Sequence, residues 1–126
     1  MACILIIEDN AANMKLVVVL LEKEGYEVLQ ATDAEDGIRL TRERHPDLIL
    51  MDVQLPRMDG LTATRLLKGD LATRDIRIVA LTAFAMPGDH ERIAAAGCDG
   101  YITKPIHYRD FLNTVAAELG KGTAKR

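Results

Sequence analysis

Residues that could support chemistry stand at the ends of four short apolar runs. Glu8 and Asp9 follow the run CILII, Asp52 follows LILM, Thr82 follows IVAL and Lys104 follows YIT. If these run ends meet, the carboxylates repel one another by about 4 kcal/mol per pair at 4 Å and an effective dielectric near 20, and a divalent cation would relieve this repulsion. Because carboxylate oxygens suit a hard ion, we predict a Mg²⁺ site, with Mn²⁺ as the alternative ion.

Asp52 is the residue best suited to act as a nucleophile. With a cation present, its carboxylate could attack a phosphoryl group and form an aspartyl phosphate. Lys104 would pair with one phosphoryl oxygen and Thr82 would donate a hydrogen bond to another, since phosphoryl transfer depends on such positioning and charge stabilisation. We therefore predict that the chain catalyses only its own phosphorylation and dephosphorylation and is not otherwise an enzyme.

These residues need elements that bring them together, and the sequence alternates between strand-like and helix-like segments. Strands are predicted at residues 3–7, 27–31, 47–52, 76–81 and 100–102, and helices at 11–24, 34–44, 59–68, 87–96 and 108–119. Repeated strand and helix units predict an α/β fold, a doubly wound five-stranded parallel sheet with five helices. Parallel strands place their carboxyl ends on one edge, where ligands bind.

The length and composition indicate one small globular domain. The chain has 126 residues, 48% hydrophobic and 28% charged, which fits a single core, and we assign residues 1–120 to the domain and 121–126 to a frayed polar tail. A net charge of −3 gives no reason to expect direct DNA binding. With no signal-type or membrane-spanning segment, the protein is expected in the cytoplasm without membrane contact.

Four separated motifs together resemble the receiver domain of two-component response regulators, the CheY-like superfamily. They are IIEDN (6–10), LILMDVQLPRMDG (48–60), IVALTA (78–83) and YITKPI (101–106). They occur in the family's order and at its usual separations, and the resemblance spans nearly the whole chain. It looks closest to the single-domain DivK-type regulators of cell cycle and polarity. The resemblance implies a flavodoxin-like sheet with strand order 2-1-3-4-5.

The resemblance also implies roles for the residues at the strand ends. Asp52 matches the phosphoacceptor, Glu8 and Asp9 match the acidic metal pair, and the backbone carbonyl of Gln54 is implied as a further metal ligand. Lys104 matches the family's lysine at this site. These assignments come from the motifs and agree with the chemistry inferred above from the residue types alone.

Three further residues match parts of the family's switch. Thr82 matches the switch hydroxyl, Tyr101 the aromatic ring that moves between exposed and buried positions, and Pro105 a proline that follows a cis peptide bond. Gln54 and Phe84 lie two residues after Asp52 and Thr82, where the family tunes water access, so we expect slow hydrolysis of the phosphorylated state. The histidines His45, His90 and His107 are scattered and are predicted to lie on the surface.

The resemblance implies a phosphorelay with two kinds of partner. A histidine kinase or histidine phosphotransfer protein would supply the phosphoryl group. A downstream kinase or regulator would bind the face formed by the fourth helix, fifth strand and fifth helix, since a phosphoryl group would draw Thr82 inward and free space for Tyr101.

Simpler interpretations exist for each residue taken singly. Glu8 and Asp9 could cap the first helix, because Asp is favoured there. Asp52 could be a polar residue that merely ends a strand, Thr82 and Lys104 could be ordinary loop residues, and Tyr101 could be a partly buried core residue.

Two other functions also remain open. One is a receiver-like module that binds partners without phosphorylation. The other is a Mg²⁺-dependent phosphohydrolase with an aspartyl nucleophile, which is disfavoured because Gln54 stands where such an enzyme needs a second Asp.

Overall fold

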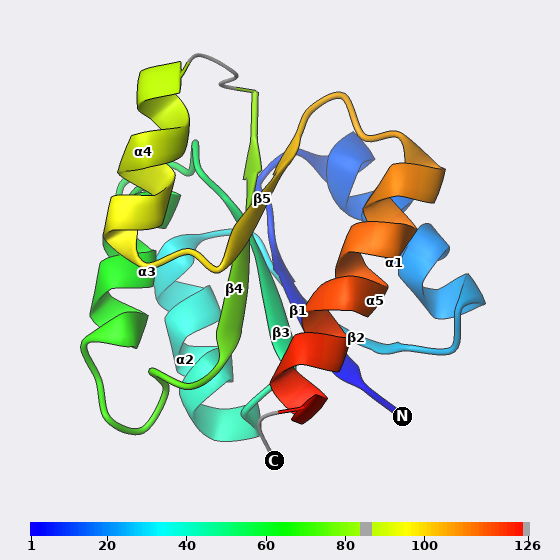
Figure 1. Cartoon of the computed structure of the whole chain (residues 1–126), viewed down its shortest axis with the longest axis horizontal. Coiled ribbons are helices and arrows are strands. Elements are labelled where there is room, and N and C mark those ends of the chain that lie inside the picture. Colours follow the sequence, from blue (N-terminus) through cyan, green and yellow to red (C-terminus); the bar gives the residue numbers. More distant parts are fainter. Residues whose placement is uncertain (84–86, 125–126) are drawn as a thin grey trace.

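The described residues form a five-stranded parallel sheet with five helices. The computed structural model describes residues 1–83 and 87–124, with side chains only up to Lys121 in the last helix. The strands are β1 (Cys3–Ile7), β2 (Glu27–Ala31), β3 (Leu48–Asp52), β4 (Arg77–Thr82) and β5 (Gly100–Thr103), in the order β2-β1-β3-β4-β5. The helices are α1 (Ala11–Lys23), α2 (Ala34–Arg44), α3 (Gly60–Lys68), α4 (Pro87–Ala96) and α5 (Tyr108–Ala124). The predicted fold class and strand order are confirmed (Figure 1).

The strand and helix boundaries differ from the predictions at a few ends. β4 continues to Thr82, and β5 continues to Thr103, which pairs with Thr82 across the sheet. The largest difference is at the C-terminus, where α5 runs to Ala124 and includes residues that we expected to fray. The short, polar sequence of this tail was the basis of that expectation.

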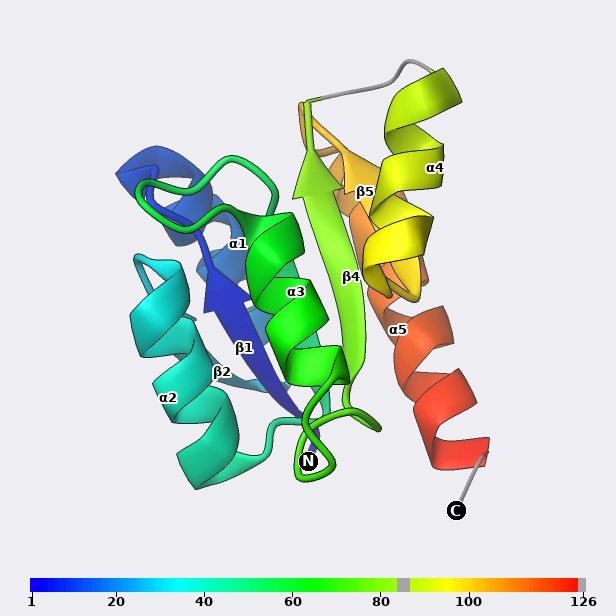
Figure 2. The same ribbon diagram turned by 90° about the vertical axis from the view of Figure 1, so that its left-hand side faces the viewer.

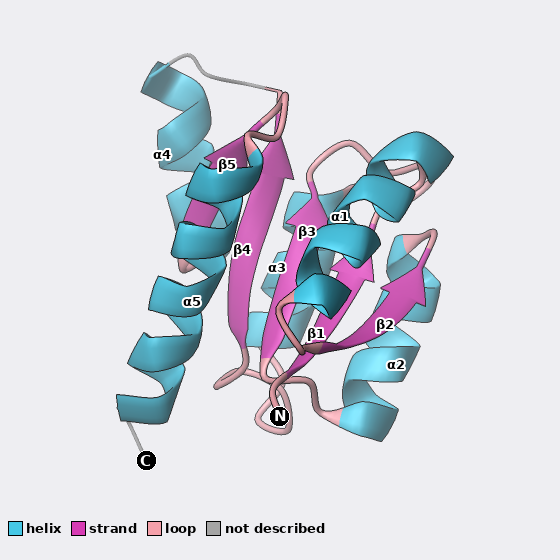
Figure 3. Cartoon of the chain, turned by 90° about the vertical axis from the view of Figure 1, so that its right-hand side faces the viewer, coloured by secondary structure: helices cyan, strands magenta, loops and turns pink. Residues whose placement is uncertain are grey.

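Helices cover both faces of the sheet. Figure 3 shows α1 and α5 in front of one face, and Figure 2 shows α2, α3 and α4 in front of the other. Successive side chains of a strand point to opposite faces, so Leu48 and Leu50 pack towards α1 and α5, while Ile49 and Met51 pack towards α2 and α3. A strand buried on both faces needs a continuous apolar run, which explains LILM.

At the carboxyl edge of the sheet, the strands end and the following helices begin. The starts of α1 and α3 help to position the polar residues there. Asn10 caps α1, where its side chain accepts a hydrogen bond from the Asn13 backbone N–H, and Asp59 caps α3 in the same way through Thr62. A side chain at Gly60 would collide with the Asp52 carbonyl oxygen. Gly60 therefore lets α3 begin directly against the backbone of β3. Among the described helices, none is long and apolar enough to cross a membrane.

Candidate functional site

Three carboxylates meet at the carboxyl edge of the sheet, which is the upper edge in Figure 1. β1 and β3 are neighbours, with Ile7 beside Met51, so the residues that follow these two come close together. One carboxylate oxygen from each of Glu8, Asp9 and Asp52 lies within 4.8 Å of the others. Glu8 is 0% exposed and Asp52 3% exposed. The predicted acidic cluster is therefore present in the fold.

Lys104 supplies the positive charge of this cluster. Its Nζ lies 3.0 Å from Glu8 Oε1 and 3.3 Å from Asp52 Oδ1. The lysine reaches the acids because β5 ends beside β4, where the Lys104 backbone N–H donates a 2.7 Å hydrogen bond to the Thr82 carbonyl. One ammonium thus faces two buried carboxylates, so the charges of the cluster are not balanced.

The pKa values of the two buried carboxyl groups shift in opposite directions. Burial, together with the contact and charge of Glu8, raises the pKa of Asp52 to about 7. Burial also opposes ionisation of Glu8, but contacts with Asp52 and Lys104 outweigh it and lower the pKa of Glu8. Burial would lower the pKa of Lys104, but Glu8 and Asp52 outweigh it and raise that pKa. Near neutral pH the cluster therefore holds a proton that a cation could displace.

The donor set fits a hard divalent cation. Two oxygens bound to one Mg²⁺ lie at most about 4.2 Å apart, twice the bond length, so a small contraction of the acidic cluster would reach bonding distance. Among the described residues, no donor reaches buried Glu8 Oε1 with hydrogen-bond geometry, despite the nearby ammonium. Asp9 is exposed and could keep the ion accessible to water and to a phosphoryl group. These features are those of a magnesium site with few protein carboxylates.

The simpler capping interpretation of Glu8 and Asp9 is wrong. Asn10 is the residue that caps α1, and Glu8 instead accepts a hydrogen bond of 3.3 Å from the Asn10 backbone N–H through Oε2. Glu8 also sits too deep for an ordinary helix cap. The sequence EDN contains three residue types with suitable side chains, so the sequence could not choose among them.

The other predicted site residues lie on neighbouring segments at the same edge of the sheet. Thr82 is buried at the end of β4. Gln54 lies in the loop after Asp52, where its backbone N–H donates to Asp52 Oδ1 at 3.1 Å, and it lines a pocket of about 500 Å³ that also includes Asp9 and Arg92. Phe84 lies outside the described residues.

Tyr101 lies on the surface, in contact with a histidine. It is 43% exposed, which excludes the core interpretation in this conformation. Its ring stacks on that of His90 at a centroid distance of 4.2 Å, and its hydroxyl lies 3.2 Å from His90 Nδ1. The sequence predicts a surface location for His90, but the residue is only partly exposed and its Nε2 is buried. Its contact with Tyr101 could not be predicted, because it joins α4 to β5. The Lys104–Pro105 peptide bond is cis.

Comparison with known proteins decides the family. Residues 4–116 match the model of the response regulator receiver domain. The chain belongs to this family. The receiver domain is also 49% identical over 117 residues to the polar-differentiation response regulator DivK of Brucella abortus strain 2308, an alignment that covers 93% of this chain and 95% of that protein.

Solved structures support the same assignment. A CheY-like response regulator receiver domain protein from Methanospirillum hungatei matches with a TM-score of 0.92 and 28% identity, covering 100% of this chain and 99% of that one. The receiver domain of the sensor histidine kinase PA1611 from Pseudomonas aeruginosa matches with a TM-score of 0.87 and 34% identity, covering 94% and 98%, and has a magnesium ion coordinated in its active site cleft. Receiver domains are signalling modules that interact with histidine kinases or phosphotransfer proteins and with downstream targets.

Proposed function

We propose that this receiver domain is a single-domain response regulator that accepts a phosphoryl group on Asp52 from a phosphohistidine donor. The observation that carries the proposal is the cluster of Glu8, Asp9 and Asp52, whose oxygens lie within 4.8 Å of one another beside Lys104. A carboxylate at the end of a fully buried strand is costly unless a cation or a reaction partner compensates it. The similarity to DivK supports a role in cell-cycle or polarity signalling.

Each residue has a defined task in the proposed transfer. A carboxylate oxygen of Asp52 attacks phosphorus while the bond from phosphorus to the donor imidazole nitrogen breaks, and the imidazole leaves with the electron pair of that bond. Lys104 pairs with one phosphoryl oxygen, and the Thr82 hydroxyl donates a hydrogen bond to another. Lys104 is already within 3.3 Å of the attacking carboxylate, so it needs only a short movement to follow the new charge.

The proposed cofactor is Mg²⁺. Its ligands would be the carboxylates of Glu8, Asp9 and Asp52 and the backbone carbonyl of Gln54. When bound, the ion would neutralise part of the charge on the phosphoryl group during transfer. Its binding also requires Asp52 to lose the proton that the raised pKa favours, so metal binding and proton release are linked.

The proposed output is a change in protein contacts. Thr82 would turn towards the phosphoryl group, and Tyr101 would leave His90 and move inward. The face formed by α4, β5 and α5 would then bind a downstream kinase or regulator. We propose that signalling occurs through such contacts in the cytoplasm, where a histidine kinase or phosphotransfer protein is the donor, and without direct DNA binding.

The test uses a small phosphodonor. Purified protein is incubated with phosphoramidate and MgCl₂ and measured by intact mass spectrometry. We expect one phosphoryl group per chain, removed by hydroxylamine as an acyl phosphate is. The group should be absent with EDTA and in Asp52→Asn. Phosphorylation that persists in Asp52→Asn would overturn the proposal, and rapid multiple turnover of a phosphate ester would favour a phosphohydrolase instead.

A further inference from the structure

Arg57 ties the loop after Asp52 to the start of α2. Its Nη2 donates a 2.9 Å hydrogen bond to Asp33 Oδ2, and its Nε donates one of 3.3 Å to Glu35 Oε2. The Arg57 backbone has φ of 64°, a left-handed conformation that a long side chain rarely adopts. Because arginine disfavours this backbone conformation, contacts elsewhere in the fold must hold it in place. The two carboxylate partners of Arg57 are such contacts.

Each of the two segments that Arg57 joins is connected to a different half of the candidate site. One half is the loop at residues 53–59, which follows Asp52 and contains Gln54. The other half is Glu8 after β1, and α2 packs against this strand. The Glu8 backbone N–H donates a 3.0 Å hydrogen bond to the carbonyl of Ala31, the last residue of β2, while Gly37 on α2 packs against Ile7, the residue before Glu8.

Both partner residues belong to the start of α2. Asp33 caps α2 by accepting a 2.8 Å hydrogen bond from the Asp36 backbone N–H through Oδ1, so its two carboxylate oxygens serve different partners. Glu35 lies in the first turn of the same helix. Arg57 therefore links the loop after β3 to the start of α2, a helix that packs against β1 where Gly37 meets Ile7.

We infer that Arg57 is a positioning residue that sets the spacing between the two halves of the metal site and so strengthens Mg²⁺ binding. This inference rests on the proposed function. Charge alone predicts that Arg57 weakens Mg²⁺ binding, because a positive side chain in the same loop as Gln54 repels a cation. The direction in which Mg²⁺ affinity changes on removing Arg57 therefore distinguishes the two effects.

The test compares Mg²⁺ affinity in two asparagine variants by isothermal titration calorimetry at low salt. Asn accepts the left-handed conformation, so Arg57→Asn removes the ion pairs without adding strain. Exposed ion pairs are weak, so we expect roughly two- to fivefold weaker Mg²⁺ binding, and this difference should shrink at high salt. The matched control is Arg39→Asn, which also loses one charge and two exposed ion pairs, to Asp36 and Glu43, but both lie within α2. Its affinity should stay unchanged.

A charge swap separates positioning from a general loss of stability. Arg57→Glu should weaken Mg²⁺ binding, and Arg57→Glu combined with Glu35→Arg should restore part of it while leaving the net charge of the chain unchanged. Recovery is only partial because the swap re-forms the pair with position 35 but not the shorter pair with Asp33. Unchanged or tighter binding in Arg57→Asn would overturn the inference about Arg57 and leave the proposed function standing. Absence of Mg²⁺ binding in the wild-type protein would instead overturn the metal site on which both depend.

Discussion

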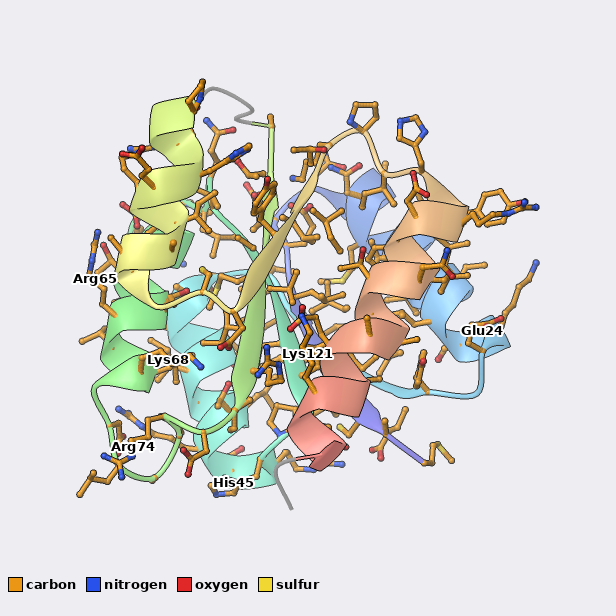
Figure 4. The ribbon with its side chains drawn as sticks, in the orientation of Figure 1. Glu24, His45, Arg65, Lys68, Arg74 and Lys121 are labelled. Carbon is orange, nitrogen blue, oxygen red and sulfur yellow. The ribbon has the colours of Figure 1, made fainter. Side chains whose placement is uncertain are left out.

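Two clusters of buried charge lie at opposite edges of the same sheet, and they differ in how well they are satisfied. At the amino edge, Lys68 Nζ donates to Asp99 Oδ2 at 2.8 Å and to the Ile76 carbonyl at 2.9 Å. Arg77 donates to Glu118 Oε1 at 2.7 Å. Lys68 on α3 and Lys121 on α5 approach this cluster from the two sides of β4 (Figure 4). Both carboxylates of this cluster, partly buried Asp99 and buried Glu118, have a cationic partner.

The two edges also differ in the pKa of their carboxyl groups. Burial opposes ionisation of Asp99, but hydrogen bonds from Lys68 and the Ile78 backbone outweigh it and lower the pKa of Asp99. At Asp52 burial and Glu8 prevail and raise the pKa to about 7. The amino-edge cluster is complete without a ligand and holds β4, β5 and α5 together. The carboxyl-edge cluster lacks one positive charge, which is the property expected of a site that binds a cation and a phosphoryl group.

The largest expected effect is a loss of stability at the amino edge. Glu118→Gln leaves the Arg77 guanidinium buried without its main carboxylate, so the free energy of unfolding should fall by about 3 kcal/mol. Urea unfolding monitored by circular dichroism measures it. Asp52 should still be phosphorylated wherever the variant is folded. The control is Glu43→Gln, whose pair with Arg39 is exposed and should cost at most about 0.5 kcal/mol. Equal losses in the two variants would contradict the comparison.

The next effect is the pH dependence of the metal-free protein. The raised pKa of Asp52 means that the folded state holds a proton that the unfolded state releases near pH 4. This contribution to stability is present below pH 4 and is lost as pH rises towards 7. The lowered pKa of Glu8 makes the opposite contribution to stability, but this contribution changes only at pH below the pKa of Glu8 in the unfolded chain. From pH 5 to 8 we therefore expect the free energy of unfolding to fall by about 2 kcal/mol relative to Asp52→Asn. A flat difference curve would refute the assignment.

A smaller effect should appear when the charge of Asp52 is removed. In metal-free buffer at pH 8, Asp52→Asn should raise the free energy of unfolding by about 1 kcal/mol, because it removes a charge that the cluster compensates poorly. Asp99→Asn should lower it under the same conditions. Chemical denaturation of both variants side by side gives the two signs. A destabilised Asp52→Asn would mean that this aspartate is a structural partner of Lys104.

Much of the site could be predicted from the sequence because strands dictate it. An apolar run buried on both faces ends in a polar residue only at a sheet edge, and parallel strands bring those ends together. This logic located Glu8, Asp52 and Lys104 without any structure. The family motifs added the strand order, which the run pattern alone does not fix.

The contacts between distant segments could not be predicted. His90 touches Tyr101, and Arg57 reaches Asp33, only because α4 packs beside β5 and the loop after β3 folds back towards α2. Nothing in the local sequence marks these pairs. The extension of α5 to Ala124 could not be predicted either, because the tail is short and polar, and a helix end of this kind forms by continuation of the turns before it rather than from its own sequence.

The central claim is that the acids at positions 8, 9 and 52 form one cation site, and calorimetric Mg²⁺ titration near pH 7 tests it most directly. For the wild-type protein we predict one ion per chain, with proton release detected as a dependence of the heat on buffer ionisation enthalpy. Asp9→Ala should bind Mg²⁺ at least tenfold more weakly, or about 1.4 kcal/mol. Undiminished affinity in Asp9→Ala, or no binding by the wild-type protein, would contradict the account.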